Sequence, residues 1–582
     1  MMSETSLNPR LQKLLIKNFR CIGEKPVEIE LDDIVVLVGS NNVGKSSILK
    51  AYELIMCEGS KNCELKIEDF PNKNICSDKY PEIELHTIVY DNSPGEKWIQ
   101  GLDNGEKSVK EKWVWKTPGK PVRYGFNAEK NEWASDTDKE KVPWGAANVA
   151  NSRRPQPHMV DAFDPPEAQS QEIISLLMSI LTDRVTNLKE DKDDKSAFQQ
   201  LLSNVKEIQK NIVEESQKQI NKIQEDLSQY IGKIFPKYEV QFDARPEDDV
   251  EKAISFFKSN PQLLIGPQGG FKCSVDRQGS GARRTLLWTA LKIISENSSP
   301  KKSENRPHVL LIDEPEICLH PSATREACDL LYNLPVKDNW QVLVTTHSPQ
   351  FIDISRDNTT IVRVERDEFG DIFGTTLFRP ERAKLTTDDK ENLKFLNLFD
   401  PYVAEFFFGG KTILVEGDTE YTAFNHVIAE NPDKYKNIHV IRARGKATIV
   451  SLVKILNQFG TEYAVLHDSD TPKAMRKNKD GVKQEIVNPA WTKNKDILAE
   501  VAKSTRRTRL VASVPNFEGA YYNDELKNEK PYAALSKLRE NPIIFEKVEK
   551  LLDGLLNYEK ELPDMAIEWN NIQNLEDKLK SI

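Results

Sequence analysis

Short runs of apolar residues, each followed by polar or acidic residues, recur along the chain and predict the buried strands of α/β domains. The clearest runs lie at residues 34–38, 308–312, 341–345, 411–415 and 463–467. Beyond residue 411 these runs alternate with helical patterns up to about residue 523, which indicates a parallel sheet covered by helices. The predicted fold class is therefore α/β.

The first part of the chain has a different pattern. Residues 14–16 form a short apolar run, and residues 83–90 alternate between apolar and polar positions, as in a strand with one buried face. From about residue 92 to 168 the sequence is irregular and rich in Trp, Pro, Gly and charge. We expect further strands and loops there, elaborating a first domain.

Residues 170–231 contain neither Pro nor Gly and predict helices. Apolar residues recur there at steps of three and four, with charged or amide residues between them; they are Val205, Ile208, Ile212, Ile220, Ile223, Leu227 and Tyr230. Two interpretations remain open for this helical insertion. It is either an arm that forms a dimer contact or a layer packed on its own domain.

A length of 582 residues is too great for one core and suggests roughly three to four domains. A polar, charged segment from Arg379 to Asn392 is expected to be a linker. The predicted division is a first domain in two parts, at 1–168 and 237–390, with the helical insertion at 169–236 between them, followed by a second domain with C-terminal helices at 391–582.

Composition narrows the classes of function. No 18-residue apolar run is present, residues 1–10 lack the apolar core of a secretory signal, and seven irregularly spaced cysteines suit a reducing compartment. We therefore expect a cytoplasmic protein without a membrane partner. The net charge of −10 does not exclude nucleic acid, because binding is local.

Two basic runs could bind a polyanion. They comprise Lys473, Arg476, Lys477, Lys479 and Lys483, then Lys503, Arg506, Arg507 and Arg509. A solvated loop is the alternative interpretation of either run.

Residues 39–46 fit the P-loop pattern G-x-x-x-x-G-K-[ST], between an apolar strand and a predicted helix. In this motif the backbone amides surround the phosphates, Lys45 reaches the β- and γ-phosphates, and Ser46 ligates Mg²⁺. The residues predicted to contact ATP here are Gly39, Asn42, Gly44, Lys45, Ser46 and Ser47.

Other segments supply the partners that a P-loop needs. The strand at 308–312 ends in Asp313, suited to the Mg²⁺ shell, and Glu314, suited to orient or deprotonate the attacking water. The strand at 341–345 leads to His347, which is placed to meet the γ-phosphate. Residues 279–284 form a small-residue turn with two arginines before a helix, a typical anion site.

Together these motifs resemble those of an SMC-like ABC ATPase, with the signature motif at 279–284 and its Ser280 and Gly281 facing nucleotide. The opening at 16–20 and the segment 319–321 also resemble that family. The resemblance implies that the signature motif of one subunit completes the site of another, and hence a head-to-head dimer. Here Gly-Ser-Gly at 279–281 replaces the usual Ser-Gly-Gly, which puts rapid turnover in doubt.

A second constellation follows residue 410. Glu416 and Gly417 end one strand, Glu420 begins the next helix, and Asp468 and Asp470 follow a second strand. Asp468 and Asp470 are two residues apart and are therefore expected on one face. These four carboxylates form a set of hard oxygen ligands for Mg²⁺ or Mn²⁺, as in two-metal phosphodiester chemistry.

Further along, Glu518 offers another carboxylate, and Lys530 offers a cation for the charge that develops in the transition state.

The E-G…D-x-D pattern resembles a Toprim domain, and its position behind an SMC-like ATPase resembles the OLD (overcoming lysogenization defect) family of nucleases over nearly the whole chain. This resemblance implies that Lys530 is the transition-state cation and that the metal ligands are Glu416, Glu420, Asp468, Asp470 and Glu518. It also matches Gly445-Lys446 to the family's glycine turn, a structural feature.

The resemblance implies an ATP-regulated, metal-dependent DNA endonuclease or nickase that acts in bacterial antiphage defence. It also implies a homodimer or higher oligomer, formed through the ATPase heads and the insertion, and in some members a helicase-like partner or a retron reverse transcriptase with its DNA. The alternative is a DNA-binding ATPase clamp for repair or recombination whose Toprim domain does not cleave.

Overall fold

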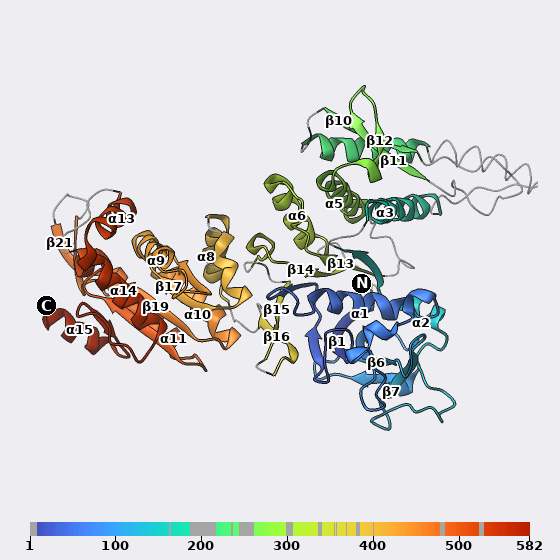
Figure 1. The fold of residues 1–582 in the computed structure, drawn as a ribbon, viewed down its shortest axis with the longest axis horizontal. Coiled ribbons are helices and arrows are strands. Elements are labelled where there is room, and N and C mark those ends of the chain that lie inside the picture. Colours follow the sequence, from blue (N-terminus) through green and yellow to red (C-terminus); the bar gives the residue numbers. More distant parts are fainter. Residues whose placement is uncertain are drawn as a thin grey trace, which may run out of the picture. The chain divides into compact units, whose positions relative to one another are not determined.

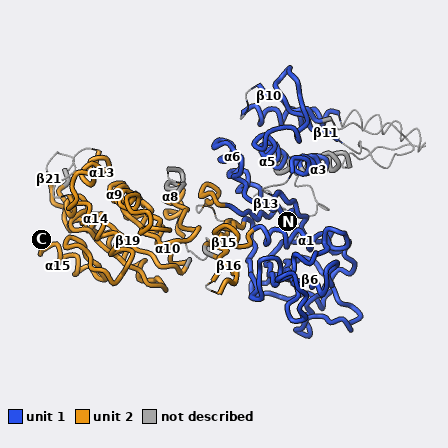
Figure 2. Tube along the Cα trace, viewed as in Figure 1, with its two compact units in different colours: residues 1–34, 46–346 blue, residues 35–45, 347–582 orange. Residues whose placement is uncertain are grey.

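The computed structural model describes residues 9–161, 165–186, 217–233, 235, 237–243, 261–297, 307–335, 340–353, 356, 358–367, 369–379, 385–399, 401–477, 483–522 and 529–581. The chain forms two compact units (Figure 2). The first contains Met1–Ile34 and Ser46–Thr346, and the second contains Val35–Lys45 and His347–Ile582. Among the described helices, none combines the length and apolar character needed to cross a membrane.

An antiparallel sheet dominates the early part of the first unit, ordered β2-β1-β4-β6-β7-β8 with β5 beside β6. Its strands are β1 (Arg10–Lys17), β2 (Val27–Glu30), β4 (Glu82–Val89), β5 (Ile99–Gly101), β6 (Lys107–Val114), β7 (Val122–Asn127) and β8 (Glu132–Trp133). Alternation in β4 buries Ile83 and Leu85 completely. The predicted half-buried strand and the strands expected after residue 92 are confirmed.

A parallel set of strands follows in the same unit. β13 (His308–Asp313) pairs with β9 (Gln156–Val160) on one side and β14 (Trp340–Thr345) on the other. Valine, leucine and isoleucine occupy the centre of β13 and β14, where both faces of the strands are buried. Asp313 at the end of β13 is registered with Thr345. Helices α2 (Ala147–Arg153) and α6 (Pro321–Asn333) complete this region.

The third part of this unit is a small antiparallel sheet with helices. β10 (Tyr238–Asp243), β11 (Gln262–Pro267) and β12 (Cys273–Ser274) form the sheet, and α3 (Pro166–Thr186) packs against α5 (Ser280–Asn297). Within the predicted insertion, residues 217–233 are helical and bury Ile220, Ile223 and Leu227. Val205, Ile208 and Ile212 lie outside the described residues.

The second unit begins within β3 (Ile34–Val38), at Val35, and β3 runs into the P-loop. The next helix, α1 (Lys45–Met56), belongs to the first unit from Ser46 on. β3 neighbours β15 (Thr359–Arg366), and β15 pairs antiparallel with β16 (Ile372–Phe378). Gly39 has φ +142°, and a Cβ there would lie 2.1 Å from the backbone oxygen of Val364. Only glycine therefore suits the first position of the loop.

The predicted linker at 379–392 is partly wrong, because α8 (Thr387–Phe399) begins within it. Thr386 and Asp389 cap this helix reciprocally: the Thr386 N–H donates to Asp389 Oδ2 at 2.8 Å, and the Asp389 N–H donates to Thr386 Oγ1 at 3.2 Å. The Asp389 carboxylate also accepts hydrogen bonds from Ser451 and Lys454 of α10 (Lys446–Phe459). A stretch that looks solvated in sequence is thus a capped and packed helix.

The rest of the second unit is the predicted parallel α/β domain. Its sheet is ordered β18-β17-β19-β22-β23, and only β23 is antiparallel to its neighbour. The strands are β17 (Lys411–Val415), β18 (Ile438–Arg442), β19 (Tyr463–Asp468), β22 (Thr508–Ser513) and β23 (Ala566–Glu568). A separate ribbon, β20 (Lys473–Lys477) with β21 (Lys483–Val487), follows Asp470.

Helices cover this sheet (Figure 1). They are α9 (Asp418–Glu430), α10 (Lys446–Phe459), α11 (Pro489–Val501), α12 (Phe517–Tyr522), α13 (Lys530–Glu540), α14 (Pro542–Leu556) and α15 (Ile572–Ser581), with a 3₁₀ helix at Pro401–Phe408. Alternate residues of the strands, such as Ile413 and Leu466, share a core with Phe424 of α9 and Leu551 of α14. Because four strands are parallel, their carboxyl ends meet at one edge, and the predicted carboxylates gather there.

Candidate functional site

An open pocket of about 470 Å³ lies at the carboxyl edge of this sheet. Its lining residues are Glu416, Gly417, Asp418, Thr419, Glu420, Arg444, Gly445, Asp468, Glu518 and Lys530. Four of the five carboxylates predicted to hold metal therefore share one pocket with the predicted cation. Asp470 is the fifth, and it does not line the pocket.

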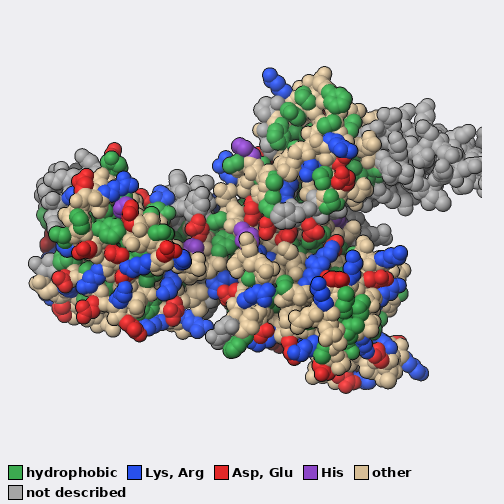
Figure 3. Space-filling model, in the orientation of Figure 1, with side chains coloured by type: hydrophobic (Ala, Val, Ile, Leu, Met, Phe, Trp, Pro, Cys, Tyr) green, Lys and Arg blue, Asp and Glu red, His purple; other side chains and the backbone are tan. Residues whose placement is uncertain are grey.

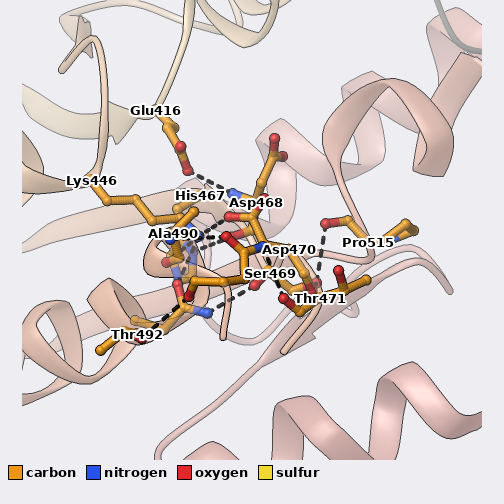
Figure 4. A network of polar contacts seen from close by, with 12 residues as sticks. Glu416, Lys446, His467, Asp468, Ser469, Asp470, Thr471, Ala490, Thr492 and Pro515 are labelled. Atoms are coloured by element: carbon orange, nitrogen blue, oxygen red, sulfur yellow. Dashed lines mark hydrogen bonds and ion pairs between the residues drawn. The ribbon is translucent and has the colours of Figure 1, made fainter. Parts of the chain in front are cut away.

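Glu416 and Asp468 end neighbouring parallel strands and are joined directly. The Asp468 N–H donates to Glu416 Oε2 at 3.1 Å (Figure 4). Asp468 Oδ1 accepts the N–H of Phe517 at 2.8 Å. The second bond places the start of α12, and hence Glu518, beside the strand end. Burial, followed by repulsion from Glu420 and Glu416, raises the pKa of Asp468.

Glu420 enters the pocket from the first turn of α9 and is only 4% exposed. A Cβ at Gly417 would lie 3.0 Å from Glu420 Oε2, so glycine leaves the room that this carboxylate occupies. Burial raises the pKa of Glu420 to about 7, with further contributions from the charges of Glu416 and Glu518. Burial also raises the pKa of Glu416.

Glu518 and Lys530 close the other side of the pocket. Lys530 Nζ lies 3.2 Å from Glu518 Oε1, and the hydroxyl of Thr419 donates to the same oxygen at 3.2 Å. The lysine side chain is 53% exposed, so its ammonium can reach a ligand that enters from solvent.

Asp470 departs from the predicted geometry. β19 ends at Asp468, and Asp470 has φ +57°, so the alternation of a strand no longer sets its direction. Its Oδ2 instead forms an ion pair with the buried ammonium of Lys446 (Figure 4). That ammonium also donates to Asn494 Oδ1 at 2.8 Å and to the Ala490 oxygen at 3.3 Å. The sequence argument for one shared face is therefore wrong.

From the sequence, Lys446 is expected to belong to a structural glycine turn. Its side chain is 4% exposed, and its charge faces an acid next to the pocket. The amide of Asn494 in turn donates to the Ser469 oxygen at 2.8 Å. The pair Gly445-Lys446 can be seen in the sequence. The ion pair of Lys446 with Asp470 cannot be predicted from it.

Carboxylate oxygens are the ligand type that a hard divalent cation prefers. The clustered carboxylates repel one another, which raises their pKa values, and a bound cation would relieve that repulsion. Glu416, Glu420, Asp468 and Glu518 would hold it. Among the residues the structure describes, however, no three acidic, His or Cys side chains already converge on a single point. A bound ion would have to draw these carboxylates closer.

Among the described residues of the two basic runs, none lines this pocket. Lys503, Arg506, Arg507 and Arg509 precede or begin β22, at the opposite edge of the parallel sheet. Arg509 pairs with Glu568 at 2.8 Å, Arg507 lies over the Tyr558 ring, and Lys503 pairs with Glu500. On the face seen in Figure 3, Lys and Arg of this unit are interspersed with Asp and Glu.

The first basic run lies on the ribbon. Lys473 pairs with Glu485 across its two strands at 2.8 Å. Arg476, Lys477 and Lys483 belong to the same two strands, and Lys479 lies outside the described residues.

The nucleotide motifs are split between the two units. In the first unit, Ser46 Oγ donates to Asp313 Oδ1 at 3.1 Å, and Thr345 Oγ1 donates to the same oxygen at 2.5 Å. This pairing of a P-loop hydroxyl with a carboxylate at a strand end is the arrangement that suits Mg²⁺. Glu314 follows with φ +47°, and its N–H donates to the Thr345 oxygen at 3.1 Å.

In the second unit, Lys45 is 5% exposed and donates to the oxygens of Gly39 and Ser40, at 3.1 and 2.8 Å. Asn42 and Gly44 have positive φ, of 62° and 92°, as a loop that turns its amides inward requires. His347 follows two residues after β14.

The remaining predicted nucleotide contacts lie in the first unit. Ser47 faces Cys21, with 3.7 Å between Oγ and Sγ. Ser280 and Gly281 begin α5, where a Cβ on Gly281 would lie 2.8 Å from the Cys318 oxygen.

Comparison with known proteins agrees with this architecture. Residues 10–93 and 102–352, more than half of the chain, match the family model described as "AAA ATPase domain". Residues 407–470 match "Overcoming lysogenization defect protein-like, TOPRIM domain". The predicted fold class, an α/β ATPase followed by a Toprim domain, is confirmed.

Individual relatives span both regions. The OLD nuclease of Thermus scotoductus is 24% identical over 543 residues, which cover 90% of this chain and 93% of that protein. Endonuclease GajA of Bacillus cereus is 24% identical over 494 residues, 81% of this chain and 77% of that protein. Among solved structures, an SMC head bound to the C-terminal winged-helix domain of ScpA covers 64% of this chain and 99% of its own, at 16% identity and a TM-score of 0.40.

Proposed function

Because this chain belongs to the OLD family, in which an AAA ATPase domain precedes a Toprim domain, we propose that it cleaves DNA at the carboxylate pocket of its second unit. The observation that supports this proposal best is that Glu416, Glu420, Asp468, Glu518 and Lys530 all line one pocket. We further propose that Mg²⁺ or Mn²⁺ is the metal and that ATP at the P-loop regulates cleavage.

The chemistry assigns a task to each group. A bound divalent ion would activate water and stabilise the leaving oxygen. The four carboxylates would bind this ion. Lys530, whose ammonium is exposed beside Glu518, neutralises charge that develops on the phosphate oxygens. The bond from the Phe517 N–H holds the carboxylate of Asp468, which lines the pocket, in one orientation.

For ATP we propose that residues 39–47 bind the phosphates and that Ser46 and Asp313 bind the associated Mg²⁺. We propose that Glu314 and His347 lie at the γ-phosphate, where Glu314 orients the attacking water. The Ser46–Asp313 hydrogen bond supports the metal assignment. We also propose that Ser280 and Gly281 act on nucleotide held by a second copy of the chain, which makes the homodimer the active form. The boundaries at 168, 236 and 390 are proposed as the limits of the ATPase, insertion and Toprim parts.

The biological role proposed is that of an effector in bacterial antiphage defence. It rests on family membership, and the name of the relative Endonuclease GajA supports endonuclease rather than exonuclease action. A defence partner, such as a helicase-like protein or a retron reverse transcriptase with its DNA, and a cytoplasmic location belong to the same proposal.

Cleavage of supercoiled plasmid tests the proposed function. We expect Mg²⁺ or Mn²⁺ to support conversion to nicked or linear DNA, and EDTA to abolish it, because the clustered carboxylates need a cation to approach a polyanion. The products are separated on agarose gels at fixed ionic strength, with and without ATP. Undiminished cleavage in EDTA would contradict a metal-dependent pocket.

Failure to cut under every condition would favour the non-cleaving clamp. The lack of a preformed three-ligand cage among the described residues is the one observation that favours this alternative.

A further inference from the structure

Arg444 lies in the turn between β18 and α10, directly beside Glu416. The Ala443 N–H donates to the Val415 oxygen at 2.8 Å, and the Gly445 N–H donates to the Glu416 oxygen at 3.0 Å. These bonds continue the parallel pairing of β18 with β17 beyond the strand ends. Arg444, between the two donors, is therefore fixed by backbone contacts rather than carried on a loose loop.

The backbone at this position is unusual. Arg444 has φ +57°, a left-handed conformation that side chains with a Cβ adopt at an energetic cost. Such conformations persist only where the surroundings enforce them. In this conformation Arg444 is exposed and lines the acidic pocket.

The other cations around the pocket already have partners. Lys530 pairs with Glu518, and Arg442 pairs with Asp418 at 3.0 Å and lies over the Tyr421 ring. Lys446 is buried against Asp470. By contrast, no hydrogen bond or ion pair joins the Arg444 guanidinium to any residue within the described ranges.

We propose that Arg444 is the positioning residue that binds a phosphate of the DNA backbone next to the bond to be cleaved. This inference rests on the proposed nuclease function and extends it to substrate binding. A pocket lined by carboxylates repels a polyanion, so it needs an adjacent cation that is not neutralised by its neighbours. A planar guanidinium matches the two non-bridging oxygens of a phosphodiester, with two parallel N–H donors.

The competing explanation is that Arg444 only balances the charge of the carboxylates. In that case its loss would change metal affinity, and DNA affinity would not change at fixed metal saturation. In the proposed role its loss weakens DNA binding and raises KM, while kcat at saturating DNA stays within a few-fold of wild type. Loss of Arg444 therefore changes metal affinity if it only balances charge, and changes DNA affinity and KM if it positions DNA.

The test compares wild type with Arg444→Asn, Arg444→Lys and Arg506→Ala. Asparagine removes the charge but tolerates positive φ, so it guards against a variant that fails to fold. Arg506 is an exposed arginine just before β22, at the opposite edge of the sheet, and controls for the loss of one positive charge. Binding of a labelled duplex is followed by fluorescence anisotropy across a salt series, and plasmid cleavage gives KM and kcat.

We expect Arg444→Asn to weaken duplex binding about tenfold or more and to lower the slope of log K against log salt by about one. Arg444→Lys should recover part of the affinity, and Arg506→Ala should bind like wild type. Equal affinity and KM in wild type and Arg444→Asn would overturn the inference, as would an equal loss in Arg506→Ala.

The two proposals fail in different ways. If wild type binds DNA and depends on Arg444 but cuts no plasmid, the positioning role stands and the proposed cleavage fails. If wild type cuts plasmid and Arg444→Asn is indistinguishable from it, cleavage stands and the positioning role fails. A wild type that neither binds nor cuts DNA overturns both.

Discussion

Replacement of Asp468 by asparagine is expected to lower the rate of DNA cleavage at least about a thousandfold while leaving nucleotide binding unchanged. Asparagine has nearly the same shape and can still accept the Phe517 N–H, which now bonds Asp468 Oδ1 at 2.8 Å. It cannot supply the negative charge that a metal ligand provides. Plasmid cleavage and the affinity for a fluorescent ATP analogue are measured on the same preparations.

The stability of this variant separates a chemical effect from misfolding. Burial and the neighbouring glutamates raise the pKa of Asp468 in the folded protein. At pH values above its pKa in the unfolded chain, the ionised carboxylate therefore destabilises the folded state. Removing that charge should therefore leave the melting temperature without metal equal or higher. Asp433→Asn, at a side chain that is 96% exposed, is the matched control and should cleave normally. Wild-type cleavage by Asp468→Asn would exclude this pocket as the catalytic site.

Replacement of Lys45 by alanine is expected to weaken ATP binding about a hundredfold and to make cleavage insensitive to ATP. The buried Lys45 ammonium now bonds the oxygens of Gly39 and Ser40, inside the loop that would surround the phosphates. Without it the loop loses the charge that faces the β- and γ-phosphates. Nucleotide affinity is measured by fluorescence titration, and cleavage rates are compared with and without ATP.

Lys50→Ala is the control for this variant, because Lys50 lies on the same helix and forms its ion pair with Glu53, one turn further along. It should bind ATP and respond to it as wild type does. Retention of ATP binding by Lys45→Ala would contradict the assignment of the P-loop. Loss of binding together with an unchanged response of cleavage to ATP would instead contradict regulation through this site.

The strands that carry the catalytic pocket were predictable because their apolar runs are continuous. Residues 412–415 and 463–467 are buried, and polar residues follow each of them. Since parallel strands place their carboxyl ends at one edge, sequence order alone brings Glu416 and Asp468 together. The basic residues from Lys503 to Arg509 precede or begin β22. Residues at the start of a parallel strand lie at the opposite edge of the sheet, so these side chains are not next to the carboxylates.

The contacts that the sequence did not reveal depend on backbone conformation and on long-range packing. Asp470 and Arg444 both have positive φ, which no periodicity argument anticipates for these residue types. Lys446 meets Asp470 only because α10 begins beside the end of β19, 24 residues further along the chain. The start of α8 was missed because its capping residues, Thr386 and Asp389, look like part of a polar linker.

The most direct test of the account is to locate the metal. Wild type without nucleotide is loaded with Fe²⁺ in place of Mg²⁺ and exposed to peroxide and ascorbate, so that radicals formed at the ion cut the nearby chain. Mass spectrometry of the fragments should place the cuts around residues 416–420, 468 and 518, and Asp468→Asn should lose them. Cuts confined to the region of Ser46 and Asp313, or the same cuts in both proteins, would contradict a metal-binding catalytic pocket at this sheet edge.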